Sequence, residues 1–552
     1  MTLPHPPRAP RHSGTTGRPR RLRARIAPVI RGSAFAAMVL AGGSATTPAP
    51  LRAQAFDLME ASIAGVHQAL DEGRLTCRDL VQGYLDRIEA YDDRGPELNA
   101  IQQVNPRALA RADSLDRQRE AQGRQGALHC VPVLLKDQVE TREMPTTYGS
   151  ALFENFVSGR DATIVRRLEG AGAIILAKTT MGEFAQRYVG SAYGIIRNAY
   201  DPTRNPSGSS GGTASGVAAN FGLVGIGEDT GGSVRGPAAV SNLVGLRPSL
   251  PLVSRYGLMP ANPSQDTMGP MTRSVDDAAR VLEVIAGYDP QDPITAWAVG
   301  HIPDSYRAGL RPDALQGIRI GVMPRRTAIP DGFEEEFAQA RTLFDRALDD
   351  LRALGAEVVE PVELELPDQT ALNNVYETEA ATDAYLAGLE DPPVRSLQEI
   401  LLSGAVIPWR AASLLGYLGH TTGDPGYLAL QAAREALRVE FLRAMADAEL
   451  DALVYLTFDA PPMPIAEDVL TNPAPNDLYG LGDNRGWSPA TGFPALTVPA
   501  GFTPDGLPIG LEFLGRPFTE GLLLEVAYAY EQGTRHRRAA PTAPALGGGR
   551  WP

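Results

Sequence analysis

Asn205 to Pro237 reads NPSGSSGGTASGVAANFGLVGIGEDTGGSVRGP. It holds two clusters of glycine and serine, 208–212 and 231–233, with a small-residue apolar segment between them. A flexible linker would instead be polar throughout. Glycine is needed where the backbone turns with positive φ, or where another group approaches the backbone closely. Two such clusters, each offering hydroxyl and N–H groups, predict a place where an oxygen atom is bound or attacked.

The composition is that of a soluble globular protein. Of the 552 residues, 43% are apolar and 21% are charged. The formal net charge is −14, and all of the acidic residues lie beyond residue 55. A basic surface for nucleic acid is therefore not expected, and we predict no nucleic-acid partner.

Residues 1–55 have the order of a secretory signal peptide. They contain nine arginines and no acidic residue, and a basic region at 18–31 precedes a small apolar region at 32–41. An Ala-Gln-Ala cleavage pattern follows at 53–55, so we expect cleavage before Phe56 and an exported protein, periplasmic or secreted. The alternative is a disordered basic tail on a cytoplasmic protein. No other apolar run approaches the roughly 18–20 residues that span a bilayer.

Buried strands and helices alternate along the chain. Apolar runs at 131–135 and 173–177 predict buried strands, and 161–171 between them has helical periodicity. Further helices are predicted at 61–91 with a break at 73–76, and at 108–120, 274–287, 333–354 and 521–532. Further strands are predicted at 318–322, 357–364, 453–456, 495–498 and 510–514, with mostly helical sequence over 380–453. This order predicts an α/β fold, with a central mixed β-sheet covered by helices on both faces.

One large domain is the simplest organisation of these elements. We expect it over residues 56–540, because no internal repeat or strong linker interrupts that range. The Pro/Gly-rich end, 541–552, is expected to be a disordered tail.

Only two of the 51 basic residues are lysines, Lys136 and Lys178. Arginine supplies positive charge elsewhere, whereas lysine can lose its proton at an accessible cost. Both lysines follow apolar strand patterns, where burial lowers the pKa of an ammonium group. A neutral lysine at pH 7 needs a shift of about three pKa units, or about 4 kcal/mol. Lys136 is thus a candidate base. Structural ion pairing is the alternative for Lys136 and the favoured interpretation of Lys178.

Other common catalytic patterns are missing from the sequence. None of the seven histidines lies near either Gly/Ser cluster, although a Ser-His-Asp triad could assemble in space. His129 is expected to be a satisfied strand histidine. The chain has no G-x-S-x-G elbow, no H-E-x-x-H zinc pattern and no Walker loop. We therefore expect no metal and no cofactor.

The only cysteines are Cys77 and Cys130, which excludes a disulfide scaffold and a Cys-rich metal site. A single disulfide between them can form if the protein is exported to an oxidising compartment. The favoured interpretation of Cys130, which lies inside an apolar strand pattern, is a buried small residue.

The lysine strand and the two clusters together resemble the amidase signature family of serine hydrolases. The matching pieces are VPVLLKD at 131–137, GSSGG at 208–212 and GEDTGGSVR at 227–235. Three further segments fit the same family, at 144–147, 177–184 and 491–501. The likeness extends in order from about Phe56 to Ala540, and the combination of motifs is highly specific.

The resemblance implies a Ser-Ser-Lys triad. Ser233 matches the nucleophile, and Ser209 matches a bridging serine that follows a cis peptide bond. Lys136 matches the general base, which would take a proton from Ser209 as Ser209 takes one from Ser233.

The resemblance also implies an oxyanion hole and supporting residues. Well-placed N–H donors stabilise a tetrahedral oxyanion by several kcal/mol each. The implied donors are the backbone N–H groups of Thr230, Gly231, Gly232 and Ser233. The residues expected to hold the loops in place are Ser210, Asp229 and Arg235.

These observations predict an exported amidase that hydrolyses a small-molecule carboxamide through an acyl-serine. The alternative is the glutamine-hydrolysing subunit of a tRNA-dependent amidotransferase, which shares the motifs but works in a cytosolic complex. The export-like head and the negative charge count against it. A non-catalytic binding module would leave the presence of Lys136, Ser209 and Ser233 together unexplained. Substrate pockets are expected from 144–150, 188–193 and segments between 370 and 490. The sequence predicts neither the amide nor the oligomeric state.

Overall fold

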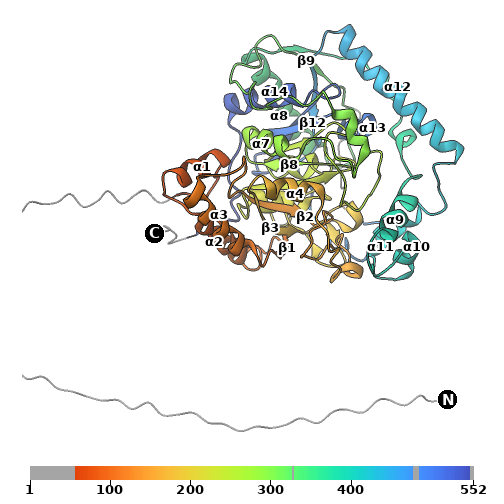
Figure 1. The fold of residues 1–552 in the computed structure, drawn as a ribbon. Coiled ribbons are helices and arrows are strands. Elements are labelled where there is room, and N and C mark those ends of the chain that lie inside the picture. The colour runs from red at the N-terminus through yellow and green to blue at the C-terminus, as the bar shows by residue number, and fades with distance from the viewer. Residues whose placement is uncertain (1–55, 326–327, 476–483, 547–552) are drawn as a thin grey trace, which may run out of the picture. The chain divides into compact units, whose positions relative to one another are not determined.

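The computed structural model describes residues 56–325, 328–475 and 484–546 (Figure 1). The predicted signal peptide, 1–55, lies outside the described residues. The strands are β1 (Ile101–Val104), β2 (Pro132–Lys136), β3 (Ile174–Thr179), β4 (Val189–Gly190), β5 (Gly194–Ile195), β6 (Val224–Asp229), β7 (Val244–Arg247), β8 (Thr267–Thr272), β9 (Arg319–Val322), β10 (Glu357–Val359), β11 (Ala452–Leu456), β12 (Ala495–Phe502) and β13 (Pro508–Leu514). The helices are α1 (Ile63–Asp71), α2 (Cys77–Tyr91), α3 (Ala108–Gln122), α4 (Thr163–Gly170), α5 (Gly211–Ala218), α6 (Arg235–Ala239), α7 (Val275–Ile285), α8 (Glu334–Ala353), α9 (Thr378–Ala387), α10 (Leu397–Leu402), α11 (Pro408–Leu415), α12 (Pro425–Asp447), α13 (Trp487–Thr491) and α14 (Glu520–Thr534).

Eleven of these strands form one mixed sheet in the order β1-β3-β2-β6-β8-β7-β12-β13-β11-β9-β10. β2 pairs in parallel with β3 and β6, and β9 pairs in parallel with β10 and β11. The remaining neighbours in this sheet are antiparallel. The predicted α/β fold with a large mixed sheet is confirmed.

Helices cover both faces of the sheet (Figure 1). The helices α4, α7, α14 and α8 contact one another in that order and pack on β3, β8, β12 and β13. Their face buries the alternate apolar side chains of the central strands, among them Leu496, Val498 and Phe513. The short helices α5 and α6 pack on the opposite face.

Glycines in the strands let α5 and α6 lie against the sheet. A Cβ atom at Gly225 in β6 would be 2.5 Å from Thr213 Cγ2 in α5. A Cβ atom at Gly245 in β7 would be 2.5 Å from Ala238 Cβ in α6. Real Cβ atoms do not approach that closely, so only glycine permits this packing. Because α5 and α6 begin next to the two Gly/Ser clusters, the sheet fixes the positions of both clusters.

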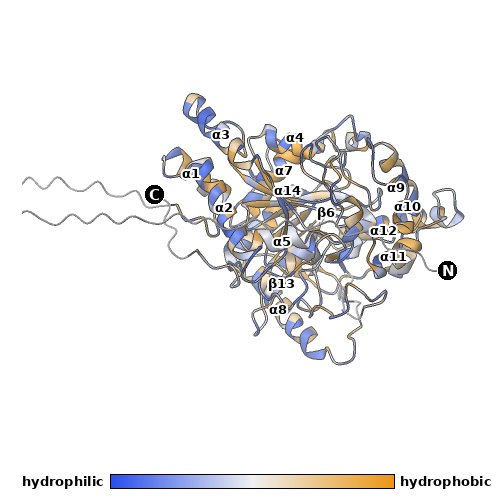
Figure 2. Cartoon of the chain, turned by 90° about the horizontal axis from the view of Figure 1, so that it is seen from below, coloured by the Kyte–Doolittle hydropathy of each residue, from blue (hydrophilic) through white to orange (hydrophobic). Residues whose placement is uncertain are grey.

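The N-terminal helices confirm the predicted break near residue 75. Thr76 caps α2, with its side chain accepting a hydrogen bond from the Asp79 N–H at 3.0 Å. Helix α3 buries only Ala108, Ala112 and Leu115, and Figure 2 shows it with largely hydrophilic colouring. Among the described residues, none of the helices combines the length and the apolar character that crossing a membrane requires.

The predicted disordered tail is ordered at its start. Ala543 is buried, and the buried Arg87 donates hydrogen bonds to the carbonyls of Ala543 at 2.6 Å and Pro544 at 2.9 Å. Thr542 Oγ1 donates to the Ala199 carbonyl at 2.5 Å. A buried guanidinium needs acceptors, and this segment supplies them. The expectation of disorder is therefore wrong for 541–546, while 547–552 lie outside the described residues.

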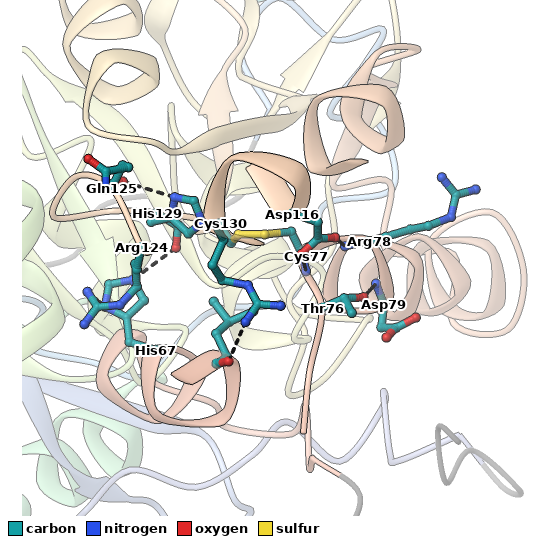
Figure 3. Close-up of a disulfide and its surroundings, with 12 residues drawn as sticks. His67, Thr76, Cys77, Arg78, Asp79, Asp116, Arg124, Gln125, His129 and Cys130 are labelled. Atoms are coloured by element: carbon teal, nitrogen blue, oxygen red, sulfur yellow. Dashed lines mark hydrogen bonds between the residues drawn. A yellow bond between two sulfur atoms is a disulfide. The ribbon is translucent and has the colours of Figure 1, made fainter. Parts of the chain in front are cut away.

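A disulfide joins Cys77 and Cys130, which are 53 residues apart (Figure 3). Cys77 is the first residue of α2, and Cys130 lies just before β2. Both residues are fully buried, as was expected of Cys130, but Cys130 is bridged rather than an isolated small residue. The bridge ties the N-terminal helices to the strand that carries Lys136.

Candidate active site

Lys136 lies at the end of β2, and its side chain is fully buried. Its Nζ donates to Ser209 Oγ at 2.7 Å and to Glu228 Oε2 at 2.8 Å. The parallel pairing of β2 with β6 brings the carboxyl ends of these strands together, which places Lys136 beside Glu228. Burial lowers the pKa of Lys136, and the Glu228 charge opposes part of that shift. The contact with Ser209 is the one that the triad requires.

The backbone around Ser209 fixes the position of this serine beside Lys136. The Gly208–Ser209 peptide bond is cis, as the resemblance implied. The Ser209 carbonyl accepts the Gly182 N–H at 3.1 Å, and the side chain is fully buried. Ser210 Oγ donates to the Glu228 carbonyl at 3.2 Å, so Ser210 connects this cluster to β6.

Ser233 lies in the second cluster, two residues before α6, and is 9% exposed. It is the most accessible member of the predicted triad, since Lys136 and Ser209 are 0% exposed. The preceding Gly232 has φ +116°, a conformation that other residues rarely adopt. The hydrogen bonds among the described residues link Lys136 to Ser209 but include none between Ser209 and Ser233.

One predicted oxyanion donor is already engaged. The Gly232 N–H donates to Asp229 Oδ1 at 2.7 Å, and the Val234 N–H donates to Asp229 Oδ2 at 3.1 Å. A fully buried carboxylate needs such donors, so the expectation that Gly232 offers a free N–H is wrong. The N–H groups of Thr230, Gly231 and Ser233 have no acceptor among the described residues.

A buried ionic cluster lies behind this loop. Arg235 Nε donates to Asp229 Oδ2 at 3.1 Å, and Arg247 donates to Asp229 Oδ1 at 3.3 Å. Burial raises the pKa of Asp229, but the two guanidinium groups outweigh it and hold the pKa well below its usual range. Asp229 and Arg235, the predicted supporting residues, thus connect the Ser233 loop to this cluster.

Two members of this cluster come from distant strands and are not predicted by the sequence. Glu512 on β13 pairs with Arg235 and accepts a hydrogen bond from the Tyr455 hydroxyl at 2.7 Å. The one signal in the sequence is a single acidic residue inside the apolar strand PIGLEFL, 508–514. A buried charge in such a strand indicates a buried partner, but it does not identify that partner.

Lys178, unlike Lys136, contacts no serine of the predicted triad. Its Nζ donates to Thr146 Oγ1 at 3.0 Å and lies 3.7 Å from Asp137 Oδ1. Asp137 in turn accepts the N–H groups of Thr147 and Gly149, both at 3.1 Å. Burial lowers the pKa of Lys178 to about 8. The favoured interpretation of Lys178, structural ion pairing, is confirmed, and the lysine supports the loop over 144–149.

A mainly apolar pocket lies against the catalytic segments. It is lined by Gln138, Tyr148, Met181, Phe184, Ala185, Met259, Pro260, Ala261, Thr378, Thr382, Leu397, Ile400, Arg410 and Leu414. The Ala261 N–H donates to Asp266 Oδ2 at 2.9 Å, and Asp266 Oδ1 is hydrogen-bonded to Thr230 Oγ1 at 2.8 Å, so the pocket wall is bonded to the Ser233 loop. Of the predicted pocket segments, 144–150 and the range 370–490 contribute, whereas 188–193 does not.

Arg410 is the one charged residue of that lining, and its nitrogens are already used. They donate to the backbone carbonyls of Glu183 at 3.1 Å and Phe184 at 2.6 Å, and to Gln186 Oε1 at 2.6 Å. The guanidinium therefore braces the pocket wall and has few N–H groups left for a ligand. The lining suits an apolar group.

One cluster of potential metal ligands occurs among the described residues. It consists of Cys77, His129 and Cys130, whose ligand atoms lie within 4.8 Å of one another (Figure 3). The two sulfurs are bonded to each other, so neither is available as a thiolate ligand. His129 Nδ1 contacts the Gln125 carbonyl at 3.1 Å, while Nε2 has no partner among the described residues, so the histidine is only half satisfied.

Comparison with known proteins agrees with this geometry. Residues 79–524 match the family model described as Amidase. A solved structure of peptide amidase from Stenotrophomonas maltophilia is 37% identical, with a TM-score of 0.77, and the match covers 88% of this chain and 99% of that one. A probable amidase of Arabidopsis thaliana is 33% identical over 88% of this chain and 92% of its own length. A glutamyl-tRNA(Gln) amidotransferase subunit of Myxococcus xanthus is 37% identical over 86% of this chain and 97% of its own. Matched over most of its length by a family model and by relatives above 30% identity, the chain is an amidase of the amidase signature family.

Proposed function

We propose that the protein hydrolyses a carboxamide to a carboxylate and ammonia or an amine through an acyl-enzyme on Ser233. Ser209 bridges the nucleophile to the base, and Lys136 is the base. The observation that carries this proposal is the 2.7 Å contact between Lys136 Nζ and Ser209 Oγ, both fully buried. A buried lysine with a lowered pKa, bonded to a serine hydroxyl, is the arrangement that activates a serine without a histidine.

The acyl group of the substrate is apolar in this proposal. The pocket bonded to the Ser233 loop is lined by methionine, leucine, isoleucine and aromatic residues, and the nitrogens of its arginine are engaged. Burying an additional methylene there is worth about 0.8 kcal/mol, or about fourfold in kcat/KM. The relative named peptide amidase makes the C-terminal amide of an apolar peptide a fitting probe.

Glutamine hydrolysis is the second candidate function, because several similar proteins are named as subunits of glutamyl-tRNA(Gln) amidotransferase. Glutamine carries an α-ammonium and an α-carboxylate, and each charge needs a partner when buried. The pocket lining has no acidic residue, and its one arginine is bonded to the protein. This lining favours a neutral apolar amide over glutamine.

The test measures ammonia release by the purified protein from a matched series of substrates. The series contains aliphatic amides of increasing chain length, phenylacetamide, a dipeptide amide with a C-terminal leucinamide, and L-glutamine. We expect kcat/KM to rise with apolar chain length and glutamine to be the poorest substrate. Glutamine as the best substrate, or co-purification with partner proteins, would establish the second candidate instead.

Two variants test the assignment of the nucleophile. Ser233→Ala should abolish hydrolysis and labelling by a fluorophosphonate probe while leaving the circular dichroism spectrum and Tm unchanged. Ser209→Ala should lower kcat by several orders of magnitude but keep Ser233 in place. Substantial turnover by Ser233→Ala would remove that serine from its role.

We also propose that the protein is exported, to the periplasm or the medium. The head at 1–55 supports this, and so does the disulfide between Cys77 and Cys130, because disulfides persist in oxidising compartments. Cell fractionation of the native host, with mass spectrometry of the mature N-terminus, tests it. The expected result is a chain that begins at Phe56 outside the cytoplasm, and an intact Met1 in the cytoplasm would refute export.

A further inference from the structure

Glu228 is the charged group nearest to Lys136, and the Ser-Ser-Lys triad gives it no task. Lys136 Nζ donates to Glu228 Oε2 at 2.8 Å, to the Glu228 backbone carbonyl at 3.2 Å and to Ser209 Oγ at 2.7 Å. An ammonium has three N–H groups, so these three acceptors fit a protonated lysine that donates all of them. A protonated lysine accepts no proton from Ser209 until it releases one of its own.

Thr230 connects Glu228 to a second buried carboxyl group. Its Oγ1 lies 2.6 Å from Glu228 Oε1 and 2.8 Å from Asp266 Oδ1. A hydroxyl donates only one proton, so in one of these two contacts the carboxyl group is the donor and carries a proton. Asp266 is that acid up to about neutral pH, because burial and then the Glu228 charge raise the pKa of Asp266 to about 7. Glu228 is left as the carboxylate that faces Lys136.

The other charges around Glu228 are matched among themselves. Asp229 is paired with Arg235 and Arg247, and Asp266 additionally accepts the N–H groups of Ala261 and Asn262. The titratable and charged groups that interact with Glu228, from β2, β7 and the segment before β8, are Lys136, Arg247 and Asp266. Lys136, whose Nζ lies 2.8 Å from Glu228 Oε2, is therefore the cation that balances Glu228.

We propose that Glu228 is the terminal proton acceptor of the triad, and that Lys136 passes a proton to Glu228 as it receives one from Ser209. The inference rests on the proposed roles of Ser233 and Ser209. Glu228 acts through Lys136 and does not touch the substrate, so it is a positioning residue that also stores the proton.

Three protons each move by one step during acylation. The O–H bond of Ser233 breaks and its proton passes to Ser209 Oγ, while the proton of Ser209 passes to Lys136 Nζ. One N–H bond of Lys136 breaks as Glu228 Oε2 becomes protonated. Lys136 stays an ammonium, and the negative charge moves from Glu228 to the Ser233 oxygen as that oxygen attacks the carbonyl carbon. The reverse movement delivers a proton to the leaving amine.

Glu228→Gln tests this assignment, because glutamine keeps the size and the hydrogen-bonding oxygen but takes no proton at neutral pH. With an apolar amide at pH 7.5, we expect kcat to fall at least 100-fold while KM stays within threefold. Glu228→Asp, which restores a carboxylate, should recover at least tenfold of that loss. The inference is overturned if Glu228→Gln keeps kcat within threefold and only the acid limb of its pH profile moves to lower pH. That result would mean that Glu228 merely raises the pKa of Lys136, and that the lysine alone is the base.

Glu531→Gln is the matched control. Glu531 is a half-buried residue on α14, where burial of the carboxyl group raises its pKa to about 7, and it accepts the Val275 N–H at 2.9 Å. Its removal should leave kcat and the pH profile unchanged. If Glu228→Gln does not fold, Glu228→Ala decides: a kcat at least 100-fold below wild type with KM within threefold supports the inference, and a kcat within threefold of wild type overturns it. A wild-type protein that hydrolyses no amide and does not label at Ser233 overturns the proposed function itself, and this inference with it.

Discussion

At the scale of single residues, Lys136 and Lys178 show how partners decide what a buried lysine does. Both lie on neighbouring parallel strands, and both are fully buried. Lys136 contacts a serine hydroxyl and a carboxylate at hydrogen-bond distance, whereas Lys178 contacts a threonine hydroxyl, and its carboxylate is 3.7 Å away. In the proposed mechanism the first passes a proton from Ser209 to Glu228. The second supports a loop.

Lys178 should make the stability of the protein depend on pH. Burial lowers its pKa to about 8 in the folded protein, against about 10.4 in an unfolded chain. The folded state therefore binds fewer protons than the unfolded state between these values, so the free energy of unfolding rises with pH from about 8 to about 10.4. The rise is at most about 3 kcal/mol from this group. Below pH 8 both states are protonated, and the contribution is flat.

Urea unfolding of wild type and Lys178→Met at pH 8 and pH 10.4 measures this effect. The variant has a side chain of similar length without the charge, and the other titrating groups cancel in the difference. We expect wild type to gain stability relative to the variant as the pH rises. If the free energy of unfolding changes by the same amount in wild type and variant between the two pH values, burial does not shift the pKa of Lys178 as described.

At the scale of elements, the strands with strong apolar runs can be predicted and the glycine-rich ones cannot. The runs at 131–135 and 173–177 correspond to β2 and β3, and the pattern places Lys136 at the correct strand end. β6, β7 and β8 are not predicted, because glycines and short length leave no periodic pattern. Gly225 and Gly245 are set by tertiary contact with α5 and α6, and Gly269 by contact with Leu246 of the neighbouring strand, which no local pattern reveals.

The residues of the candidate site likewise divide into those that sequence motifs identify and those that only the fold brings together. Motifs identify Lys136, Ser209 and Ser233, because the residues near them in sequence are distinctive. Glu512 and Tyr455 reach the Ser233 loop from β13 and β11, and their roles depend on strand order rather than on any motif. The engagement of the Gly232 N–H by Asp229 depends on hydrogen-bond geometry three residues apart, which the sequence does not encode visibly.

The close packing of α6 on β7 should be sensitive to a single methyl group. Gly245→Ala places a Cβ atom 2.5 Å from Ala238 Cβ and 3.2 Å from the Val234 carbonyl oxygen. Overpacking of this kind costs about 1–3 kcal/mol and displaces the helix. Since Ser233 precedes Val234 directly, we expect kcat to fall at least tenfold together with a lower Tm.

Gly521→Ala is the control for that change. Gly521 lies in the first turn of α14, and a Cβ atom there would meet nothing within 4 Å. We expect unchanged kcat and an equal or higher Tm, because alanine restricts the unfolded chain. Thermal unfolding and steady-state kinetics of both variants decide the matter, and wild-type kcat and Tm in Gly245→Ala would refute the close packing.

At the scale of the whole molecule, contacts between distant segments close the domain at its N-terminal end. Arg537 pairs with Glu60 at 2.8 Å, and Arg87 bonds the carbonyls of 543–544. The Glu60 carboxyl is partly buried, which raises its pKa, but the charges of Arg537 and Arg273 and the hydrogen bonds from Arg537 and Asn220 together outweigh burial and lower the pKa to about 2. The start and the end of the described chain are therefore held to the same body of the protein.

The disulfide acts at this scale too, and its removal gives the last prediction. The N-terminus of α2 is anchored twice: by the Cys77–Cys130 bond, and by Asp116, which accepts the N–H groups of Cys77 at 2.8 Å and Arg78 at 3.0 Å (Figure 3). Closing a loop of 53 residues restricts the unfolded chain and stabilises the fold by about 2–4 kcal/mol.

The double variant Cys77→Ala/Cys130→Ala should lose about that much free energy of unfolding in urea. It should keep its kcat at 25 °C, because the Asp116 anchor and the pairing of β2 remain. A phosphine reductant should lower the stability of wild type to the level of the variant and leave the variant unchanged. A variant as stable as the oxidised wild type would show that the bond contributes nothing to the fold.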